Sequence, residues 1–522
     1  MESTSSDVTS ATAPSPWDLS ALIKSYDVRG VVPEPFSPTV AEAIGAAFAT
    51  VVVIPDAGDA ADATPPGLDA LDGPAEGAAT VTTPRPRVVI GHDMRESGPE
   101  LVAAFARGLT AAGIDVVLIG LCSTDGLYYA SGALGVPGAM FTASHNPAEY
   151  NGIKLCRSGA RPVGQDTGLA RVRELAEQYL TYGLPGPATQ LGQLTERDML
   201  ADYAAFLRGL VDISGIRPLK VVVDAGNGMG GHTVPAVLGT GAGLPELPLE
   251  IVPLYFELDG SFPNHEANPL EPANLLDLQA AVVEHGADIG IAFDGDADRC
   301  FVIDELGAPV SPSAITALVG LREVAREQAA GRKPTIIHNL ITSAAVPDLM
   351  RAAGAQVVRT RVGHSFIKAQ MAEHDAVFGG EHSAHYYFRD FFFADTGMLA
   401  ALHVLAALGE QPHPLSGLAE VYEPYTSSGE LNSRVDDVPA ARARVVQAYV
   451  EQQGAGPVTV DELDGLTISH WDSQPQWWFN LRASNTEPLL RLNVEAADED
   501  IMVKVRDDVL ALVRAADAEK NA

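Results

Sequence analysis

Short apolar runs alternate with longer amphipathic segments through most of the chain. Residues 87–95 (RVVIGHDMR) predict a strand that runs into a loop, 98–113 predict a helix, and 114–121 (IDVVLIGL) predict the next strand. The same order recurs in three later segments, 219–231, 287–299 and 334–354. Continuous Val and Ile runs between helices are typical of strands that are buried on both faces, as in parallel α/β layers. The pattern therefore predicts several successive α/β units.

The end of the chain follows a different pattern. Residues 467–498 predict a strand, a loop and a strand, and 499–517 predict an amphipathic closing helix. This order is typical of an α+β domain, which we expect after residue 425. A chain of 522 residues is too long for one hydrophobic core, so several domains are expected.

Composition narrows the class of protein. Apolar residues make up 46% of the chain, which is ample for buried cores. We expect no membrane span, because we find no apolar segment of roughly 18 residues, and no signal peptide at the polar N-terminus. A net charge of −34 opposes extended contact with nucleic acid. The three cysteines are widely spaced and form no CxxC pair, which favours reduced thiols in a cytoplasmic protein.

One segment interrupts the first α/β unit. Residues 54–86 are rich in Pro, Gly, Ala and acidic side chains and have low complexity. This composition predicts a disordered surface insertion without a catalytic part.

Residues 141–155 (FTASHNPAEYNGIKL) combine a serine and a histidine with two turn dipeptides. Asn-Pro at 146–147 and Asn-Gly at 151–152 favour turns, so Ser144 is expected on a loop after the apolar run 136–141. Taken alone, the stretch leaves two interpretations open: Ser144 is a nucleophile, or it is a turn residue with a polar neighbour.

Three aspartates alternate directly after an apolar strand. Asp294, Asp296 and Asp298 can converge on one hard cation if the backbone turns there, and this predicts Mg²⁺. Solvated acids on a loop are the simpler alternative. An EF-hand is disfavoured, although Glu305 falls at its twelfth position, because Arg299 replaces the glycine expected at the sixth and the flanks are strand-like. Arg299 would suit an anion beside the cation.

Further polar groups fall at predicted turns. Near the C-terminus a guanidinium, two hydroxyls and an amide suit a phosphate dianion, unless they form an ordinary hairpin turn: Arg482, Ser484, Asn485, Thr486, with Arg491 shortly after. Glu381, Ser383 and His385 alternate, so one face of an extended segment would present them to sugar hydroxyls, unless they form a buried polar turn. His364 and Lys368 follow a strand, and Tyr26, Asp27 and Arg29 precede a loop; such residues are often structural.

Taken together, these motifs resemble the α-D-phosphohexomutase family. YDVRG, TASHNP…NGIK, DGDADR, VGHSFIK, GEHSAH and RASNTEPLLR occur in the family's order over about residues 20–515. The resemblance implies four domains around a central cleft, three α/β domains with mixed sheets and a C-terminal α+β domain. The expected bounds are 1–18 for a disordered tail and 19–197, 198–309, 310–425 and 426–522 for the domains.

The resemblance also implies a mechanism. Ser144 corresponds to the family's phosphoserine, and Asp294, Asp296 and Asp298 would hold Mg²⁺ against a phosphoryl oxygen, with Ser144 as a further ligand. The phosphoryl group would pass to a hexose 1-phosphate, give a bound 1,6-bisphosphate and return from the other end of the sugar; hexose 1,6-bisphosphate would also serve as activator. Lys154 and Arg29 are the implied acid–base candidates, with His145 and His385 as helpers, and the choice among them stays open.

The implied substrate-binding residues are Tyr26, Arg299, His364, Lys368, Glu381, Ser383, His385, Arg482, Ser484, Asn485, Thr486 and Arg491. The loop ending in Ser-Ala-His resembles the bacterial phosphomannomutase (phosphomannomutase/phosphoglucomutase) branch, although His382 and Ala384 depart from its common Met and Gly. We therefore expect a cytoplasmic phosphomannomutase, a monomer or homodimer that acts on small hexose phosphates, with GDP-mannose biosynthesis as a plausible setting.

Several alternatives to this function stay open. Within the family they are a phosphoglucomutase and a phosphoglucosamine mutase. Outside it they are a metal-dependent sugar-phosphate phosphatase and a sugar-phosphate binder without turnover.

Overall fold

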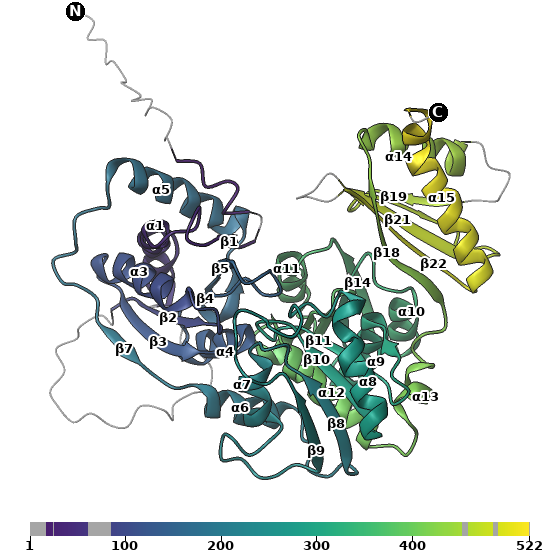
Figure 1. Cartoon of the computed structure of the whole chain (residues 1–522), viewed down its shortest axis with the longest axis horizontal. Helices are drawn as coiled ribbons and strands as arrows, with labels where there is room; N and C mark the ends of the chain where they lie inside the picture. The colour runs from purple at the N-terminus through teal and green to yellow at the C-terminus, as the bar shows by residue number, and fades with distance from the viewer. Residues whose placement is uncertain (1–16, 25, 61–84, 452–457, 484–488, 521–522) are drawn as a thin grey trace, which may run out of the picture. The chain divides into compact units, whose positions relative to one another are not determined.

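The computed structural model describes residues 17–24, 26–60, 85–451, 458–483 and 489–520 (Figure 1). They form two compact units. The first is drawn from 1–121, 130–143 and 147–198, and the second from 122–129, 144–146 and 199–522. The predicted tail lies outside the described residues except for its last two positions, and so does 61–84 of the predicted insertion.

The first unit is built on one mixed sheet with the strand order β1-β5-β4-β2-β3-β7 and β6 beside β5. Its strands are β1 (Val28–Val31), β2 (Arg87–His92), β3 (Asp115–Leu121), β4 (Gly138–Phe141), β5 (Tyr150–Arg157), β6 (Arg161–Pro162) and β7 (Leu194–Glu196). Strands β4, β2, β3 and β7 are parallel, whereas β5 runs antiparallel to both β4 and β1.

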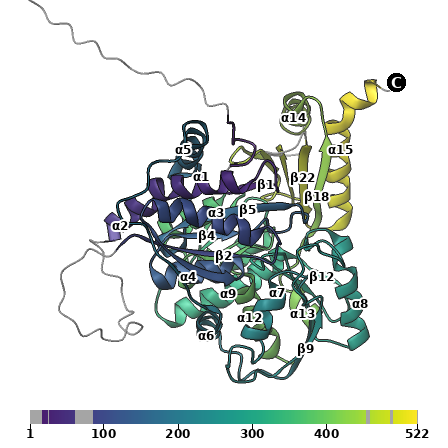
Figure 2. The ribbon, with the colours of Figure 1, turned by 60° about the vertical axis from the view of Figure 1, so that its left-hand side comes forward.

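Helices of the first unit cover this sheet. They are α1 (Pro38–Phe48), the π-helical turn η1 (Ala49–Val53), α2 (Ile54–Ala60), α3 (Gly98–Ala111), α5 (Leu169–Tyr182) and the 3-10 turns η2 (Ser158–Ala160) and η3 (Gln165–Thr167). Helix α4 (Thr124–Leu134) is divided: its residues 124–129 belong to the second unit and 130–134 to the first. Figure 2 shows α1 between α5 and α3, and it contacts both. Phe105 packs on Phe48 and Phe141 with ring centroids 6.0 and 5.4 Å apart, which marks the centre of the core.

The continuous helix over Pro38–Gly58 corrects two expectations. It is 21 residues long and apolar enough to cross a membrane by length and composition, contrary to our expectation that no such segment exists. However, 67% of its apolar stretch is buried inside the unit, so its hydrophobicity is explained by core packing. The helix also includes the first residues of the predicted insertion, Ile54–Ala60, which are helical.

The second unit contains two further mixed sheets, with orders β12-β11-β10-β8-β9 and β14-β13-β15-β16-β17. The strands of the first are β8 (Leu219–Asp224), β9 (Leu249–Leu254), β10 (Ile289–Phe293), β11 (Cys300–Ile303) and β12 (Pro309–Val310). Those of the second are β13 (Thr335–Asn339), β14 (Gln356–Thr360), β15 (Phe378–Gly380), β16 (Tyr386–Phe388) and β17 (Ala394–Asp395).

Helices flank these two sheets. They are α6 (Leu200–Leu210), α7 (Gly230–Val237), α8 (Leu276–His285) with the turn η4 (Pro272–Leu275), α9 (Pro312–Ala329), α10 (Ala345–Ala352), α11 (His364–His374), α12 (Gly397–Gly409) with η5 (Arg389–Phe391) before it, and α13 (Leu415–Ala419). The central strands β8, β10 and β13 are almost fully buried, as their Val and Ile runs predict.

The last sheet is antiparallel throughout, with the order β18-β22-β21-β20-β19. Its strands are β18 (Thr426–Arg434), β19 (Thr459–Asp461), β20 (Leu466–Ser469), β21 (Trp477–Ala483) and β22 (Leu489–Ala496). Helix α15 (Glu499–Lys520) lies along it and contacts α14 (Val438–Val446), which continues into η6 (Gln447–Glu451) (Figure 1). The predicted fold class is confirmed. The segment predicted as strand, loop and strand over 467–498 contains three strands, β20, β21 and β22, and β18 and β19 complete the sheet.

The three mixed sheets share one strand plan. In each, a central strand lies between two parallel neighbours, and the second neighbour turns back into an antiparallel strand: β3-β2-β4-β5, β9-β8-β10-β11 and β14-β13-β15-β16. The turns β4–β5, β10–β11 and β15–β16 are therefore equivalent, and each starts at the carboxyl end of a parallel strand, where open α/β sheets bind ligands. The three predicted loops with Ser144, Asp294 and Glu381 are these three turns.

Candidate active site

Ser144 lies in the β4–β5 turn and is buried, with an exposed fraction of 4%. Its backbone is left-handed (φ 50°), which costs a non-glycine residue about 1–2 kcal/mol. The Oγ atom donates a hydrogen bond to Asp294 Oδ2 at 2.8 Å and accepts one from Arg299 Nη2 at 3.3 Å. His145 Nδ1 lies 3.2 Å from the same Oγ and contacts the Arg299 guanidinium. Backbone strain held by several contacts is typical of a functional position.

Gly295 allows the two turns to approach each other. A Cβ atom at this position would lie 2.4 Å from the carbonyl oxygen of Ser144, closer than any side chain tolerates. On the other side, the N–H of Met229 donates to the carbonyl oxygen of Gly295 at 2.9 Å. The glycine in DGDADR is therefore required by the close approach of Ser144.

The three aspartates converge as predicted. Asp294, Asp296 and Asp298 are fully buried, and one carboxylate oxygen of each lies within 4.8 Å of the others. Strands β10 and β11 flank them, and Glu305 accepts hydrogen bonds from Ser416 instead, so the EF-hand alternative is wrong. Buried carboxylates with only oxygen donors suit Mg²⁺, and burial of all three disfavours the alternative of solvated acids.

Arg299 neutralises part of this charge. Its guanidinium is 2% exposed and lies 2.7 Å from Asp294 Oδ2 and 4.0 Å from Asp298 Oδ1. Burial alone would lower the pKa of Arg299, but Asp294 and Asp298, with Asp296, raise it above its ordinary value. One guanidinium against three carboxylates leaves net negative charge at the loop, which a divalent cation would balance.

The sugar-loop candidates lie in the β15–β16 turn. This is a tight turn with Ala384 at φ 65°, so the expected extended segment with a common face is wrong. Glu381 is nevertheless fixed: it accepts hydrogen bonds from Asn339 Nδ2, the N–H of Gly363 and the hydroxyl of Tyr387 at 2.7–3.1 Å.

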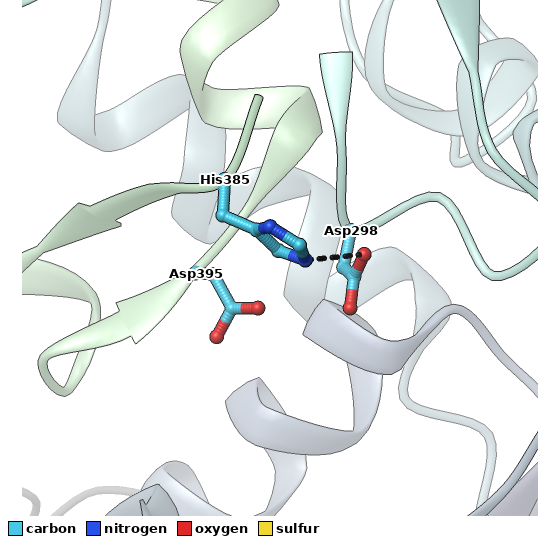
Figure 3. Close-up of side chains that lie close together, drawn as sticks. All are labelled: Asp298, His385 and Asp395. Carbon is cyan, nitrogen blue, oxygen red and sulfur yellow. Dashed lines mark ion pairs between the residues drawn. The ribbon is translucent and has the colours of Figure 1, made fainter. Parts of the chain in front are cut away.

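His385 connects this turn to the aspartates. Its Nε2 atom lies 3.7 Å from Asp298 Oδ1, and Figure 3 shows the ring directed at this carboxylate, with Asp395 beside it. Its Nδ1 atom lies 3.1 Å from Ser383 Oγ, and an isolated antiparallel bridge pairs its backbone with Arg299. Burial and the charge of Arg299 lower the pKa of His385, which favours the neutral imidazole.

His364 and Lys368 lie in the first turns of α11. Lys368 is buried: its Nζ atom pairs with Asp395 Oδ1 at 2.6 Å and lies 3.9 Å from the centre of the Tyr128 ring. The Lys368 side chain is only 2% exposed, so its position suits support of Asp395 better than direct contact with a substrate.

Two arginines form a separate group on the last sheet. Arg482 of β21 and Arg491 of β22 face each other in register, and both lie within 4 Å of Glu430 on β18. Two like charges in directly opposed positions repel each other, so one carboxylate leaves room for a further anion. Ser484, Asn485 and Thr486 lie outside the described residues.

The remaining candidates belong to the first unit. Arg29 of β1 pairs in register with Gly152 of β5, so Arg29 and Lys154 extend from the same face of the sheet. Arg29 pairs with Asp27 at 2.6 Å, and Tyr26 directly precedes them and is half-buried.

Two residues at the start of α4 went unpredicted. Thr124 donates a hydrogen bond to Asp296, and the neighbouring Asp125 is a buried carboxylate. The tetrapeptide STDG at 123–126 predicts only the start of a helix. No pattern in the sequence therefore connects Thr124 and Asp125 with the three aspartates.

Comparison with known families agrees with this arrangement. Models of the four phosphoglucomutase/phosphomannomutase domains match in order: α/β/α domain I at residues 74–182, domain II at 201–307, domain III at 311–425 and the C-terminal domain at 430–512. The chain belongs to the phosphoglucomutase/phosphomannomutase family. Enzymes of this family are isomerases that move a phosphoryl group within a sugar phosphate.

Individual relatives cover most of the chain. A phosphomannomutase of Salmonella typhimurium is 41% identical over 430 residues, 81% of this chain and 90% of the relative. A protein named phosphohexose mutases from Xanthomonas campestris is 38% identical over 92% of this chain and 96% of its own. A crystal structure of a family protein from Burkholderia thailandensis has a TM-score of 0.77 at 28% identity and covers 95% of this chain and 98% of that one.

Proposed function

We propose that this enzyme interconverts mannose 1-phosphate and mannose 6-phosphate, with phosphorylated Ser144 as the phosphoryl donor. The observation that carries the proposal is the position of Ser144 Oγ, which contacts Asp294 and Arg299 directly at the buried aspartate turn. Relatives named phosphomannomutase at 36–41% identity support mannose as the sugar.

In the first half-reaction, O6 of mannose 1-phosphate attacks the phosphorus of phospho-Ser144, and the bond from phosphorus to Oγ breaks. The O6 proton passes to a base, for which Lys154 and Arg29 are our candidates, with His145 and His385 as helpers. The product is enzyme-bound mannose 1,6-bisphosphate. Arg299 Nη2 lies 3.3 Å from Oγ, so its positive charge would stabilise the negative charge that develops on Oγ as the bond to phosphorus breaks.

The second half-reaction repeats the first with the sugar reversed. Ser144 Oγ attacks the phosphorus of the 1-phosphate, the bond from that phosphorus to O1 of the sugar breaks, and the group that took the O6 proton gives a proton to O1. Mannose 6-phosphate then leaves, and phospho-Ser144 is restored. In both orientations we assign the phosphate that does not react to Arg482, Arg491 and residues 484–486. The sugar hydroxyls are assigned to Glu381, Ser383 and His385.

Asp294, Asp296 and Asp298, with a phosphoryl oxygen on Ser144, would hold Mg²⁺. The ion would neutralise charge on the transferring phosphoryl group when bound. Free hexose 1,6-bisphosphate would activate the enzyme by phosphorylating Ser144. Within the described residues the buried cysteines Cys122, Cys156 and Cys300 form no disulfide, which suits a cytoplasmic enzyme.

The test compares mannose 1-phosphate, glucose 1-phosphate and glucosamine 1-phosphate as substrates, with Mg²⁺ and a trace of hexose 1,6-bisphosphate. We expect conversion of mannose 1-phosphate to the 6-phosphate, complete loss in Ser144→Ala, and full activity in Ser214→Ala, the same change at an exposed serine. A preference for glucose or glucosamine would correct the sugar and keep the mechanism. Release of inorganic phosphate without isomerisation would identify a phosphatase, and binding without turnover a sugar-phosphate binder.

A further inference from the structure

The start of α4 holds one of the three aspartates directly. The N–H of Thr124 donates to the carbonyl oxygen of Asp296 at 3.0 Å, and Thr124 Oγ1 donates to Asp296 Oδ2 at 2.6 Å. Thr124 is fully buried. One residue therefore fixes both the backbone and the carboxylate plane of Asp296.

The next residue, Asp125, is a buried carboxylate whose described hydrogen bonds come from hydroxyl groups. It accepts them from Ser123 Oγ, from Tyr203 OH of α6 at 2.7 Å and from Thr396 Oγ1 at 2.6 Å. Burial raises the pKa of Asp125 to about 6. Burying a carboxylate is costly unless its hydrogen bonds are satisfied, and here three segments far apart in sequence supply them.

Thr396 connects this cluster to the third mixed sheet. Its Oγ1 atom also accepts the N–H of Leu399 and so caps the N-terminus of α12. The preceding residue, Asp395, pairs with Lys368, and Lys368 in turn lies over the ring of Tyr128, one turn after Thr124 on α4. The first two turns of α4 are thus connected to the end of β17 at two points, through Thr396 and through Lys368 of α11, which pairs with Asp395.

The hydrogen bonds of Thr124, Asp125 and Thr396 connect residues on two sides of the aspartate turn. Asp395 lies beside His385 and Asp298 in Figure 3, and one donor atom of each lies within 4.8 Å of the others. From Asp296 the contacts run through Thr124, Asp125 and Thr396 to Asp395, one oxygen of which lies within 4.8 Å of donor atoms of His385 and Asp298. Each of the three aspartates is therefore contacted by a group outside its own turn: Asp294 by Ser144, Asp296 by Thr124 and Asp298 by His385.

We infer that Thr124 and Asp125 are positioning residues for the metal site: Asp125 fixes the first turn of α4 between α6 and the third mixed sheet, and Thr124 orients the Asp296 carboxylate for the cation. The inference rests on the proposed metal site at Asp294, Asp296 and Asp298. Groups that orient ligating carboxylates change metal affinity by about 10–100-fold when removed, and the hydroxyl of Thr124 meets this description.

The test measures Mg²⁺ binding to the full chain by calorimetry. Thr124→Val removes the hydroxyl and keeps the shape of the side chain, so we expect about tenfold weaker binding or more. Thr124→Ser keeps the hydroxyl and should bind within about threefold of the unsubstituted protein, since the hydrogen bond is retained. Asp125→Asn should weaken binding because an amide cannot accept all three hydroxyl bonds.

A matched control separates positioning from general stability. Thr316 is another fully buried threonine, and its hydroxyl donates a hydrogen bond to the carbonyl oxygen of Pro312 in its own helix. Thr316→Val deletes this hydroxyl and should leave Mg²⁺ affinity unchanged. Excess Mg²⁺ should also restore turnover in Thr124→Val, which it would not do for a misfolded enzyme. If Thr124→Val does not fold, the comparison of Thr124→Ala with Thr124→Ser replaces it.

The outcomes distinguish this inference from the proposed function. Unchanged Mg²⁺ affinity in folded Thr124→Val, when Asp296→Asn has lost binding, would overturn the positioning role and leave the metal site standing. Absence of binding by the unsubstituted protein would overturn the metal site and this inference with it.

Discussion

At the scale of single residues, each of the three equivalent turns holds a non-glycine residue in the left-handed region. They are Ser144, Ala297 and Ala384, with φ angles of 50°, 59° and 65°. Neither alanine carries a functional group, so their strain comes from the shape of the turn. The shape of these turns is therefore kept at a cost in stability.

Ala384→Gly should stabilise the protein by about 1 kcal/mol, because glycine adopts a positive φ without the Cβ clash. Urea unfolding would measure the change. Ala325→Gly is the control with the opposite sign: this alanine is exposed inside α9, where glycine costs about 1 kcal/mol. Loss of stability in Ala384→Gly would show that the turn does not strain its backbone.

His338 of β13 makes the fold sensitive to acid. Burial lowers its pKa to about 4, with small contributions from Arg359 and Arg351. Because the folded pKa lies below the unfolded value of about 6.5, its contribution to stability is complete above pH 6.5 and falls as the pH drops toward 4. At pH 5 the loss is about 2 kcal/mol.

His338→Gln removes this titration. Between pH 7 and pH 5 the free energy of unfolding should decrease in both proteins, and the decrease should be about 2 kcal/mol smaller in His338→Gln than in the unsubstituted protein. His413→Gln, the same change at an exposed position, should keep the original pH profile. Identical profiles for both variants and the unsubstituted protein would contradict the role of His338.

At the scale of elements, the strands and the loops that follow them were predictable and the detailed turns were not. β2, β8, β10 and β13 follow from apolar runs, because burial on both faces imposes such runs on a strand. β3 was also predicted from its apolar run, although only Val116 and Ile119 of it are buried. The same positions place Ser144 and the aspartates at carboxyl ends of strands. The tight β15–β16 turn could not be predicted, because its shape depends on Asn339 and Gly363, which hold Glu381 from other segments of the chain, as well as on Tyr387 of β16.

Gly295→Ala tests the contact between two of these elements. The new Cβ would have to displace the Ser144 carbonyl oxygen, and a shift of about 1 Å in a reacting group can cost about 100-fold in rate. We expect a loss of that order in mutase activity, measured with folded protein. Gly215→Ala adds the same methyl group where nothing lies within 4 Å and should change neither activity nor melting temperature.

At the scale of the whole molecule, the net negative charge of −34 lowers the stability of the folded state. The sequence has 68 acidic against 34 basic residues, so negative charges on the surface repel one another. Some carboxylates are neutralised locally, as Glu327 is by Arg332 and Arg389. Salt shortens the range of this repulsion, from about 30 Å at 0.01 M to about 3 Å at 1 M.

The melting temperature should therefore rise between 0.01 M and 1 M NaCl, because screening removes more repulsion than attraction. Scanning calorimetry in chloride, without sulfate or phosphate that could occupy the arginine group, would measure it. A melting temperature that falls with salt would mean that surface ion pairs outweigh the repulsion.

The repeated turn also bears on how such an enzyme changes over generations. Three copies of one strand plan present the proposed nucleophile Ser144, the aspartates and the proposed sugar-binding Glu381 from equivalent places, each on its own sheet. If the proposed roles hold, we expect a substitution in one turn, at His382 or Ala384, to alter which sugar is preferred while the other two copies keep the phosphoryl chemistry. Because each of the three sheets carries a different part of the proposed site, substrate preference can change over generations while the reaction itself is retained.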